Sequence, residues 1–324
     1  MSPTVRRLCA FTIVVALAVG FDLAAAQPYP SKSVRLIIPF PPGGSNDIVG
    51  RLVATHLSER LGKPVVVENR AGAGGVVGSE AAAKSPPDGH TVLLVSAAHA
   101  INPSLYTLPY DHETAFVPIA KLGGGPNVLT VHPSVRVASV RELIALAREK
   151  PGHIIISAAG VGTFSHLASE LFKSLTGIDV MIVQFKGGGP AMIDTIGGHS
   201  HIYAGSLIQQ LPHIKSGKLK ALATGGAKRS AILPEVPTVV EAGVPGYEAT
   251  NWWGIVAPAG TPAAIVARLD RELAGVLATP DVQKRFLSEG ADVDHVGQAA
   301  FGRFIAAETA KWARIIREAH IKAE

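Results

Sequence analysis

From Val34 onwards, short apolar runs alternate with longer amphipathic stretches. A short apolar run bounded by turn residues is typical of a strand that is buried on both faces, and an amphipathic stretch is typical of a helix that covers such a strand. Because the two alternate, we expect parallel strands joined by right-handed crossover helices. The pattern therefore predicts an α/β protein.

The first series of elements begins at residue 34. Between its first two strands, apolar residues recur at spacings of three and four, which predicts a helix with Ser45 or Asn46 as its N-cap and Gly62 just past its end. Strands are expected at 34–39, 65–67 and 91–95, and a helix of small residues is expected at 76–84.

A second series begins after the glycine-rich segment 123–126. It has the same alternation of apolar runs and amphipathic stretches, so it predicts a second α/β unit. Its helices are expected at 140–149, 163–175, 190–196 and 207–215, and its strands at 154–157, 180–184, 201–204 and 219–224.

The last part of the chain contains long helices without strands of their own. A short helix is expected at 237–242, an extended segment at 252–257, and long helices at 262–278 and 301–319. Long amphipathic helices need an apolar surface to cover, and the first series has a sheet. We therefore expect two lobes, 27–126 plus 250–324 and 127–249. The chain would cross between them near 124–128 and 246–252, which permits hinge closure over a ligand.

The N-terminus carries the three parts of a secretory signal peptide. Arg6 and Arg7 precede an apolar run at 8–20, and three alanines follow at 24–26. The run is shorter than the roughly 20 residues that a membrane span needs. We therefore interpret residues 1–26 as a signal peptide that is cleaved after Ala26, and we expect the mature protein to be free in the periplasm.

Composition narrows the class of partner. Cys9 is the only cysteine among the 324 residues and lies in the expected signal peptide, so the mature chain has no disulfide and no cysteine metal site. A net charge of +5 is too small for a chain of this length to indicate a nucleic-acid partner. We expect no nucleic acid, no metal and no cofactor, and a monomeric protein.

Ligands of open parallel sheets bind beyond the carboxyl ends of the strands, where strand-to-helix loops gather. The first such loop, 39–47, combines prolines with two glycines and leads directly into a helix. Unpaired N–H groups at a helix start attract anions, so this loop is a candidate carboxylate site that needs no arginine. A tight turn followed by an N-cap explains the same residues equally well. The candidate ligand-binding residues here are Phe40, Gly43, Gly44, Ser45, Asn46 and Asp47.

A loop of the same character lies in the second series at 157–166, rich in small and hydroxyl-bearing residues. One such loop in each lobe would present hydrogen-bond donors from both walls of a cleft. Lys186 is the one cation in the strand-end loops, although a solvated surface lysine explains it as well. The candidates from these and the remaining loops are Ser96, Ala97, Ser157, Ala158, Gly160, Gly162, Thr163, His166, Lys186, Gly205 and Ser206.

Other patterns in the sequence admit other functions. The segment 43–47 differs by one residue from the hydrolase elbow Gly-x-Ser-x-Gly, so a secreted serine esterase using Ser45 is the main enzymatic alternative. It would need a histidine and an acid beside Ser45, and we expect no enzyme. The glycines at 72–78 miss the spacing of a dinucleotide-binding loop and are better explained by helix–sheet packing. His199 and His201 share a strand face but lack further metal ligands at suitable spacing.

Several short motifs occur one after another along the whole expected mature chain, in a characteristic order. They are Pro39-Phe40 with Gly43-Gly44, Val67-Glu68-Asn69-Arg70, Pro87-Asp88-Gly89, Asn102-Pro103, Lys186-Gly187-Gly188-Gly189-Pro190 and Pro234-Glu235-Val236-Pro237. A chain with these motifs in this order resembles the Bug family, the periplasmic solute-binding proteins of tripartite tricarboxylate transporters.

The resemblance implies a fold and a function. The fold is a two-lobed periplasmic binding protein, a Venus flytrap of the type II kind, in which each lobe is a mainly parallel sheet flanked by helices. The function is capture of a small organic carboxylate between the lobes by backbone N–H groups, hydroxyls and ordered water, followed by delivery to membrane permease subunits. Carried onto this sequence, the resemblance implies that 43–47, Ser96, Ala97 and 157–166 hold the ligand.

This chain departs from the family pattern at one point. Where relatives commonly carry Gly-Gly-Gln-Val-Asp and then an acidic or amide residue, it has Gly-Gly-His-Ser-His at 197–201 and Ala-Gly-Ser at 204–206. A smaller, less acidic wall would admit a bulkier or doubly charged ligand. The ligand class therefore stays open between aliphatic dicarboxylates and aromatic, terephthalate-like ones. A ligand-sensing partner of a periplasmic sensor domain is a further alternative.

Overall fold

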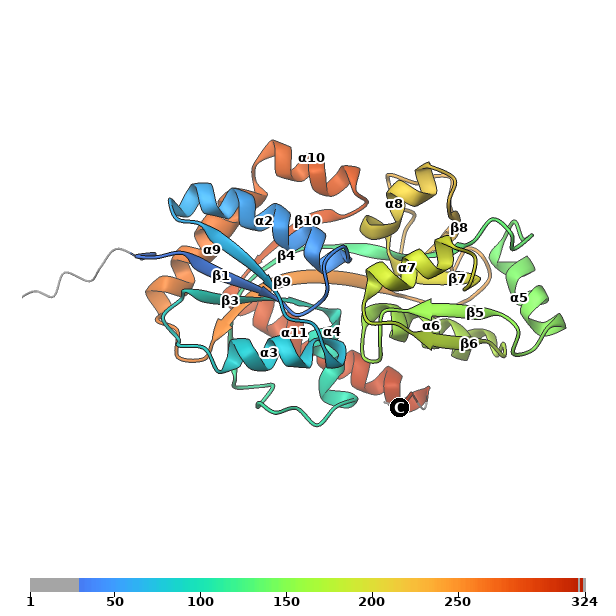
Figure 1. The fold of residues 1–324 in the computed structure, drawn as a ribbon, viewed down its shortest axis with the longest axis horizontal. Coiled ribbons are helices and arrows are strands. Elements are labelled where there is room, and N and C mark those ends of the chain that lie inside the picture. Colours follow the sequence, from blue (N-terminus) through green and yellow to red (C-terminus); the bar gives the residue numbers. More distant parts are fainter. Residues whose placement is uncertain (1–28, 320, 323–324) are drawn as a thin grey trace, which may run out of the picture. The chain divides into compact units, whose positions relative to one another are not determined.

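The computed structural model describes residues 29–319 and 321–322. The expected signal peptide at 1–26, with its cleavage after Ala26, lies outside the described residues. The described residues from Lys32 onwards belong to one compact unit, which contains every helix and strand named below and is drawn in Figure 1.

The first strand group has the expected α/β order. β1 (Val34–Ile38), β2 (Val65–Asn69) and β3 (Thr91–Ser96) pair in parallel in the order β2-β1-β3. The helices between them are α2 (Ser45–Leu61), the single turn η1 (Ala73–Gly75) and α3 (Val76–Ala83), and β3 is followed by α4 (Ala97–Ile101) and η2 (Asn102–Ser104). The apolar runs form strands because side chains on both faces, such as Leu36 and Ile37, are almost wholly buried.

One long strand connects this group to the second. β4 (Phe116–Val131) pairs antiparallel with β9 (Thr250–Pro258) as far as Pro126, and with β7 (Ile202–Ser206) from Asn127 onwards. The second half of β4 also pairs with β8 (Lys220–Thr224), and its first half pairs with β10 (Asp292–Gly297). β4 therefore passes from one strand group to the other in the region where we expected the first crossing.

The glycines at 123–125, where the sequence pattern indicates a break between series, lie inside β4. A Cβ at Gly123 would be 2.3 Å from the carbonyl oxygen of Asp292. Glycine at this position therefore lets β10 approach the backbone of β4 closely, which is a packing requirement and not a turn signal.

The second strand group continues from β7 to β5 (Ile155–Ala158) and β6 (Met181–Gln184), which pair in parallel. Its helices are α5 (Val140–Glu149), α6 (Phe164–Thr176), α7 (Gly188–Ile196) and α8 (Leu207–Lys215), and α5 and α8 have the expected bounds. The complete path is β2-β1-β3-β9-β4-β7-β5-β6, with β8 and β10 paired to β4. The residue bounds expected for the two lobes stay a prediction.

The long C-terminal helices cover the first strand group, as expected. α9 (Ala263–Leu277) lies with α2 on one face of the strands, and α11 (Gln298–Glu318) lies with α3 and α4 on the other (Figure 1). The Nε1 atoms of Trp252 in β9 and Trp312 in α11 donate to the same carboxylate oxygen of Glu308, at 3.1 and 3.2 Å. The buried Glu308 therefore joins α11 to the sheet.

The expected short helix at 237–242 is wrong. The hydroxyl of Thr238 accepts a hydrogen bond from the Glu241 N–H at 3.0 Å, and the Val239 N–H donates to the Thr224 carbonyl at 2.9 Å, so the segment forms turns beside β8. The sequence pattern also fails to predict α10 (Pro280–Ser288) and β10. β10 is polar and half exposed, so it lacks the apolar run that marks the other strands.

Candidate functional site

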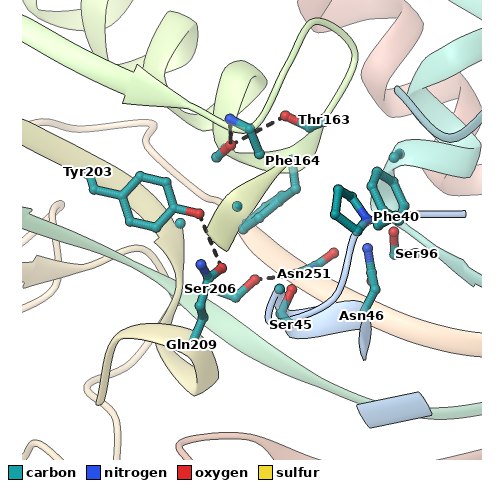
Figure 2. Close-up of a pocket in the computed structure, with 17 residues that line it drawn as sticks. Phe40, Ser45, Asn46, Ser96, Thr163, Phe164, Tyr203, Ser206, Gln209 and Asn251 are labelled. Atoms are coloured by element: carbon teal, nitrogen blue, oxygen red, sulfur yellow. Dashed lines mark hydrogen bonds between the residues drawn. The ribbon is translucent and has the colours of Figure 1, made fainter. Parts of the chain in front are cut away.

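A cavity lies at the carboxyl ends of strands from both groups. Its empty space, including the part open to solvent, is about 460 Å³. Figure 2 shows its walls, with Phe40 and Ser96 on one side and Tyr203 and Gln209 on the other. The lining residues are Phe40, Pro41, Gly44, Ser45, Asn46, Ser96, Ala98, Ala159, Thr163, Phe164, Ser165, Gly188, Tyr203, Gly205, Ser206, Gln209 and Asn251.

Four helices begin at this cavity. The start of α2 contributes Gly44 as its N-cap, and the start of α6 contributes Thr163 as its N-cap. The first residue of α7, Gly188, and the N-cap of α8, Ser206, also line it. A helix N-terminus carries partial positive charge and unpaired N–H groups, so four of them together favour a bound anion.

The expected N-cap of α2, Ser45 or Asn46, is wrong by one residue. Gly44 has the extended cap conformation, with φ −85° and ψ 169°, and Ser45 is the first helical residue. Glycine supplies no side-chain acceptor, and no hydrogen bond from the Ser45 or Asn46 N–H is formed within the described residues. These two N–H groups are therefore left for a ligand.

The start of α6 is organised by hydroxyl groups. The Thr163 hydroxyl donates to the Gly160 carbonyl at 2.6 Å and accepts from the His166 N–H at 3.4 Å, and the Ser165 hydroxyl accepts from the Ala159 N–H at 2.8 Å. These bonds hold the loop 159–163 against the first turn of the helix. The loop that was expected to bind an anion is thus rigidly attached to a helix start.

The cavity wall contains no ionisable acid or base apart from the Tyr203 phenol. Within the described residues, no Lys, Arg, His, Asp or Glu side chain lines it. Burial raises the pKa of the Tyr203 hydroxyl, partly offset by hydrogen bonds with Gln209 and Ser165, so Tyr203 stays a neutral donor at physiological pH. The site is therefore positive through backbone dipoles alone.

Eight of the predicted site residues line the cavity and nine do not. Those in the lining are Phe40, Gly44, Ser45, Asn46, Ser96, Thr163, Gly205 and Ser206. Those outside it are Gly43, Asp47, Ala97, Ser157, Ala158, Gly160, Gly162, His166 and Lys186. The assignment of these residues as ligand contacts stays a prediction, but most of the second set have other partners in the structure.

Asp47 has its own hydrogen-bond network beside the site. Its carboxylate accepts from the Gly43 N–H at 3.0 Å, from Arg51 at 3.0 Å and from Asn69 at 2.9 Å. Burial alone would raise the pKa of Asp47, but the hydrogen bonds from Arg51, Asn69 and Gly43 outweigh it and hold the pKa below its usual value. Asp47 therefore fixes the loop before α2.

The remaining residues outside the lining shape the two loops. Ser157 shares a hydrogen bond of 2.6 Å with Thr195, and Ala158 is fully buried. Gly160 and Gly162 have positive φ, and a Cβ at Gly162 would be 2.7 Å from the Tyr106 ring. Lys186 is exposed to solvent.

Asn251, which sequence reasoning missed, joins the two walls of the cavity. Its Nδ2 donates to the Ser206 hydroxyl at 3.1 Å, and its Oδ1 accepts from the Ala97 N–H at 3.3 Å. Ala97 therefore contributes to the site through this bond. The other lining residues that sequence reasoning missed are Pro41, Ala98, Ala159, Phe164, Ser165, Gly188, Tyr203 and Gln209. Pro41 had a signal because it lies in the loop 39–47, and Gly188 because it belongs to the motif at 186–190. Ala159, Phe164 and Ser165 had a signal because they lie in the loop 157–166.

Two buried histidines near the site are neutral. Burial lowers the pKa of His166 from 6.5 to about 4. Burial and the neighbouring His112 lower the pKa of His99 from 6.5 to about 3. The Nδ1 of His166 accepts from the Gly162 N–H at 3.4 Å, which requires an unprotonated Nδ1.

We expect the free energy of unfolding to fall as the pH is lowered below the usual pKa of histidine. Both histidines bind protons near pH 6.5 in the unfolded chain, but only near pH 4 (His166) and pH 3 (His99) in the folded protein. Each histidine therefore lowers the free energy of unfolding by about 2 kcal/mol between pH 7.5 and 5. Urea unfolding at both pH values measures the loss. His166→Gln, which keeps an acceptor for the Gly162 N–H, should reduce the loss by about 2 kcal/mol, the contribution of this histidine. An undiminished loss would contradict the role of His166.

The esterase alternative lacks its catalytic partners. Ser45 lines the cavity, but within the described residues no histidine or acid lines it with Ser45.

The glycines at 72–78 serve packing, since a Cβ at Gly78 would be 2.6 Å from the Arg70 carbonyl oxygen. His201 accepts the Ile155 N–H at 3.0 Å, and the described residues contain no group of three or more potential metal ligands. None of the helices in the described part of the chain has the length and apolarity needed to cross a bilayer.

The α/β fold and the cavity of helix starts between two strand groups are suited to a protein that binds a small anion. The family described as "Tripartite tricarboxylate transporter family receptor" matches residues 49–321. The chain belongs to this family, the Bug-type periplasmic solute-binding proteins of tripartite tricarboxylate transporters. It is therefore a binding protein and not an enzyme, which confirms the resemblance seen in the motifs.

Individual relatives can be aligned with this chain over nearly their full length. The chain is 38% identical to protein BugT of Bordetella pertussis over 98% of both chains. It is similar to the structure of Rpa4515 from R. palustris with adipate, with 34% identity, a TM-score of 0.88 and coverage of 91% of this chain and 99% of the other. It is also similar to MatC from Rhodopseudomonas palustris with bound malate, with 29% identity, a TM-score of 0.84 and coverage of 89% and 100%. These structures confirm the expected fold class.

Proposed function

We propose that this protein, exported after cleavage at Ala26, binds a small organic carboxylate in the cavity and delivers it as a monomer to the permease subunits of a tripartite tricarboxylate transporter. The observation that carries the proposal is the convergence of four helix starts on a cavity wall without charged side chains. Each charge-assisted hydrogen bond to a carboxylate is worth about 1.5–3 kcal/mol. A few such bonds account for micromolar affinity, about −8 kcal/mol.

The ligands of relatives support a dicarboxylate. The solved relatives described above contain adipate and malate, which are both diacids. Phe40 and Phe164 in the lining provide apolar contact for the part of the ligand between its carboxylates, so an aromatic diacid of the terephthalate kind is as suitable as an aliphatic one.

We propose that the two strand groups and their helices are lobes, bounded near 126–127 and 249–250, that close over the ligand. Contacts between the groups beside the cavity support this proposal. The Tyr106 hydroxyl donates to the Val161 carbonyl at 2.9 Å, and its ring lies against Gly162. Ligand binding would favour the closed state by adding contacts to both lobes.

A thermal-shift screen tests the proposed function. Mono-, di- and tricarboxylates, aliphatic and aromatic, are added to the mature protein, and a specific ligand must raise the melting temperature because it binds only the folded state. We expect at least one dicarboxylate to raise it in a saturable manner. If none of the carboxylates raises the melting temperature, the proposed function is wrong.

Tyr106→Phe should weaken ligand binding about five-fold, through faster dissociation. The change removes one neutral hydrogen bond of the closed state, worth about 1 kcal/mol, and leaves the cavity wall unchanged. Stopped-flow release of the ligand found in the screen measures the effect. Tyr110→Phe is the matched control, because Tyr110 is bonded to Ser79 within the first strand group. Equal release rates in both variants would contradict the role of Tyr106 in closure.

A further inference from the structure

A second hollow lies at the amino ends of two strands of the second strand group. Its empty space, including the part open to solvent, is about 1370 Å³. β5 and β7 begin here, directly after the lining residues Ile154 and His201. The carboxyl ends of the same strands reach the ligand cavity, at Ala159 and Ser206. The hollow therefore lies at the opposite edge of these strands, the outer end where Figure 1 shows α5, and it shares no lining residue with the cavity.

Four basic side chains line this hollow, which we call the basic pocket. They are Arg136, Lys150, His153 and His201. Arg136 lies in the segment after β4, Lys150 and His153 lie in the loop after α5, and His201 precedes β7. Among the described residues, no Asp or Glu side chain lines the basic pocket. A concave surface with charges of one sign attracts a ligand of the other sign, here an anion.

The exposed basic groups of the pocket are not used by the protein itself. The side chains of Arg136, Lys150 and His153 form no hydrogen bond and no ion pair with other described residues. Asp179 lies near the loop, because its carboxylate would be 3.6 Å from a Cβ at Gly152, but it is not part of the lining and pairs with none of these three side chains. The three side chains can therefore turn toward a bound anion without breaking any existing contact.

His201 adds a donor whose direction is fixed. Its Nδ1 accepts from the Ile155 N–H at 3.0 Å, so the proton of the neutral ring lies on Nε2. Burial, together with the neighbouring His132, lowers the pKa of His201 and keeps its ring neutral at neutral pH. Nε2 has no partner within the described part of the chain, so its N–H is left for a ligand.

The set of donors matches a tetrahedral anion better than a planar one. A carboxylate has two oxygens in one plane, whereas a phosphate group presents oxygens in several directions and carries up to two negative charges. The fork of Arg136 can bind two phosphate oxygens at once, and Lys150 supplies a point charge. The basic pocket thus differs in kind from the ligand cavity, whose lining has no cationic side chain in the described residues.

We propose that the basic pocket is a binding site for a phosphate group, which Arg136, Lys150, His153 and His201 hold from three segments of the second strand group. The site goes beyond the capture of a carboxylate and does not depend on it. Soluble phosphate compounds and phospholipid headgroups present the same oxygens, so both are sources to be tested. Because most of the charges are exposed, binding should weaken as salt is added.

NMR titration of the isotope-labelled mature protein with inorganic phosphate tests the proposal, at low ionic strength. We expect saturable shifts of the backbone N–H signals of His153 and Ile155, because the first lines the pocket and the second is bonded to His201. Phosphate that enters the ligand cavity would instead shift the signals of Ser45 and Asn46. Acetate should bind at the basic pocket at least about ten-fold more weakly. The absence of saturable shifts of His153 and Ile155, or equal affinity for acetate, would overturn the proposal.

Variants of Arg136 test whether this side chain holds the phosphate. Arg136→Gln should weaken phosphate binding about ten-fold, and Arg136→Lys, which keeps the charge but not the fork, should restore part of the affinity. Arg141→Gln is the matched control, since Arg141 is an exposed arginine at the start of α5 that does not line the pocket. It should change the affinity by no more than about two-fold. Equal weakening by Arg136→Gln and Arg141→Gln would show that only net charge attracts phosphate, and would overturn the site.

Vesicle sedimentation distinguishes the two sources of the phosphate group. Vesicles of phosphatidylglycerol mixed with phosphatidylcholine are compared with vesicles of phosphatidylcholine alone. Sedimentation of the protein with the first kind only, reduced in Arg136→Gln, would support the site with a lipid headgroup as its ligand. Sedimentation with neither kind, while inorganic phosphate binds, would support the site with a soluble phosphate compound. If neither inorganic phosphate nor vesicles bind in a manner that depends on Arg136, the proposal is overturned, and the thermal-shift screen with carboxylates still decides the proposed function.

Discussion

Gly44→Phe is expected to abolish carboxylate binding while the protein stays folded. Gly44 lines the cavity as the N-cap of α2, and its φ of −85° is accessible to any residue, so the substitution strains no backbone. A Cβ at this position meets only the Pro41 carbonyl oxygen, at 3.9 Å. The aromatic ring would occupy the space in front of the Ser45 and Asn46 N–H groups, so we expect a loss of affinity of about 100-fold or more.

Gly44→Ser is the matched control for this prediction. Serine is a favoured N-cap residue, and its small side chain leaves most of the cavity free, so the melting temperature should be unchanged or slightly higher. The ligand found in the thermal-shift screen is titrated into both variants by calorimetry, and circular dichroism checks the fold. Wild-type affinity in Gly44→Phe would exclude the start of α2 as part of the carboxylate site.

The first half of the fold was predictable because its signals are local. The spacing of apolar residues in α2 and the positive φ at Gly62 that ends it depend on neighbours within a few residues. The same holds for α5 and α8, whose bounds agree with the sequence pattern. The loops at the strand ends were predictable as cavity walls for the same reason, since the order of strands and helices brings them to one edge of the sheet.

The residues that sequence reasoning missed are positioned by contacts between distant segments. Asn251 reaches the cavity because β9 pairs with both β3 and β4, and nothing near Asn251 in the sequence indicates this pairing. Conversely, Asp47 was an attractive ligand candidate because it is polar and lies in the right loop. Its partner Asn69 is 22 residues away, at the end of a neighbouring strand, so the sequence alone does not reveal that its carboxylate is already used.

The glycines that determine packing are equally hidden from local analysis, and Gly254 gives the second large prediction. It lies in β9, and a Cβ there would be 2.2 Å from Phe301 and 3.0 Å from the Ala120 carbonyl oxygen. Phe301 is fully buried in α11 and packs edge-on against Trp252, with ring centroids 5.9 Å apart. A side chain at Gly254 would therefore force α11 away from the sheet.

Gly254→Val should lower the free energy of unfolding by about 3 kcal/mol or more, and the melting temperature by roughly 5 °C or more. Gly302→Ala, on α11 itself, is the control. Its Cβ would meet Pro118 at an ordinary contact distance of 3.5 Å, and alanine favours a helix over glycine by about 1 kcal/mol. The free energy of unfolding of both variants is measured in urea. A loss in Gly254→Val without a loss in Gly302→Ala would show that crowding at the β9–α11 contact, and not any substitution near it, destabilises the protein. The methyl groups of valine could not be accommodated if α11 packs on β9 as closely as the Phe301 contact indicates. Wild-type stability in Gly254→Val would therefore contradict this packing.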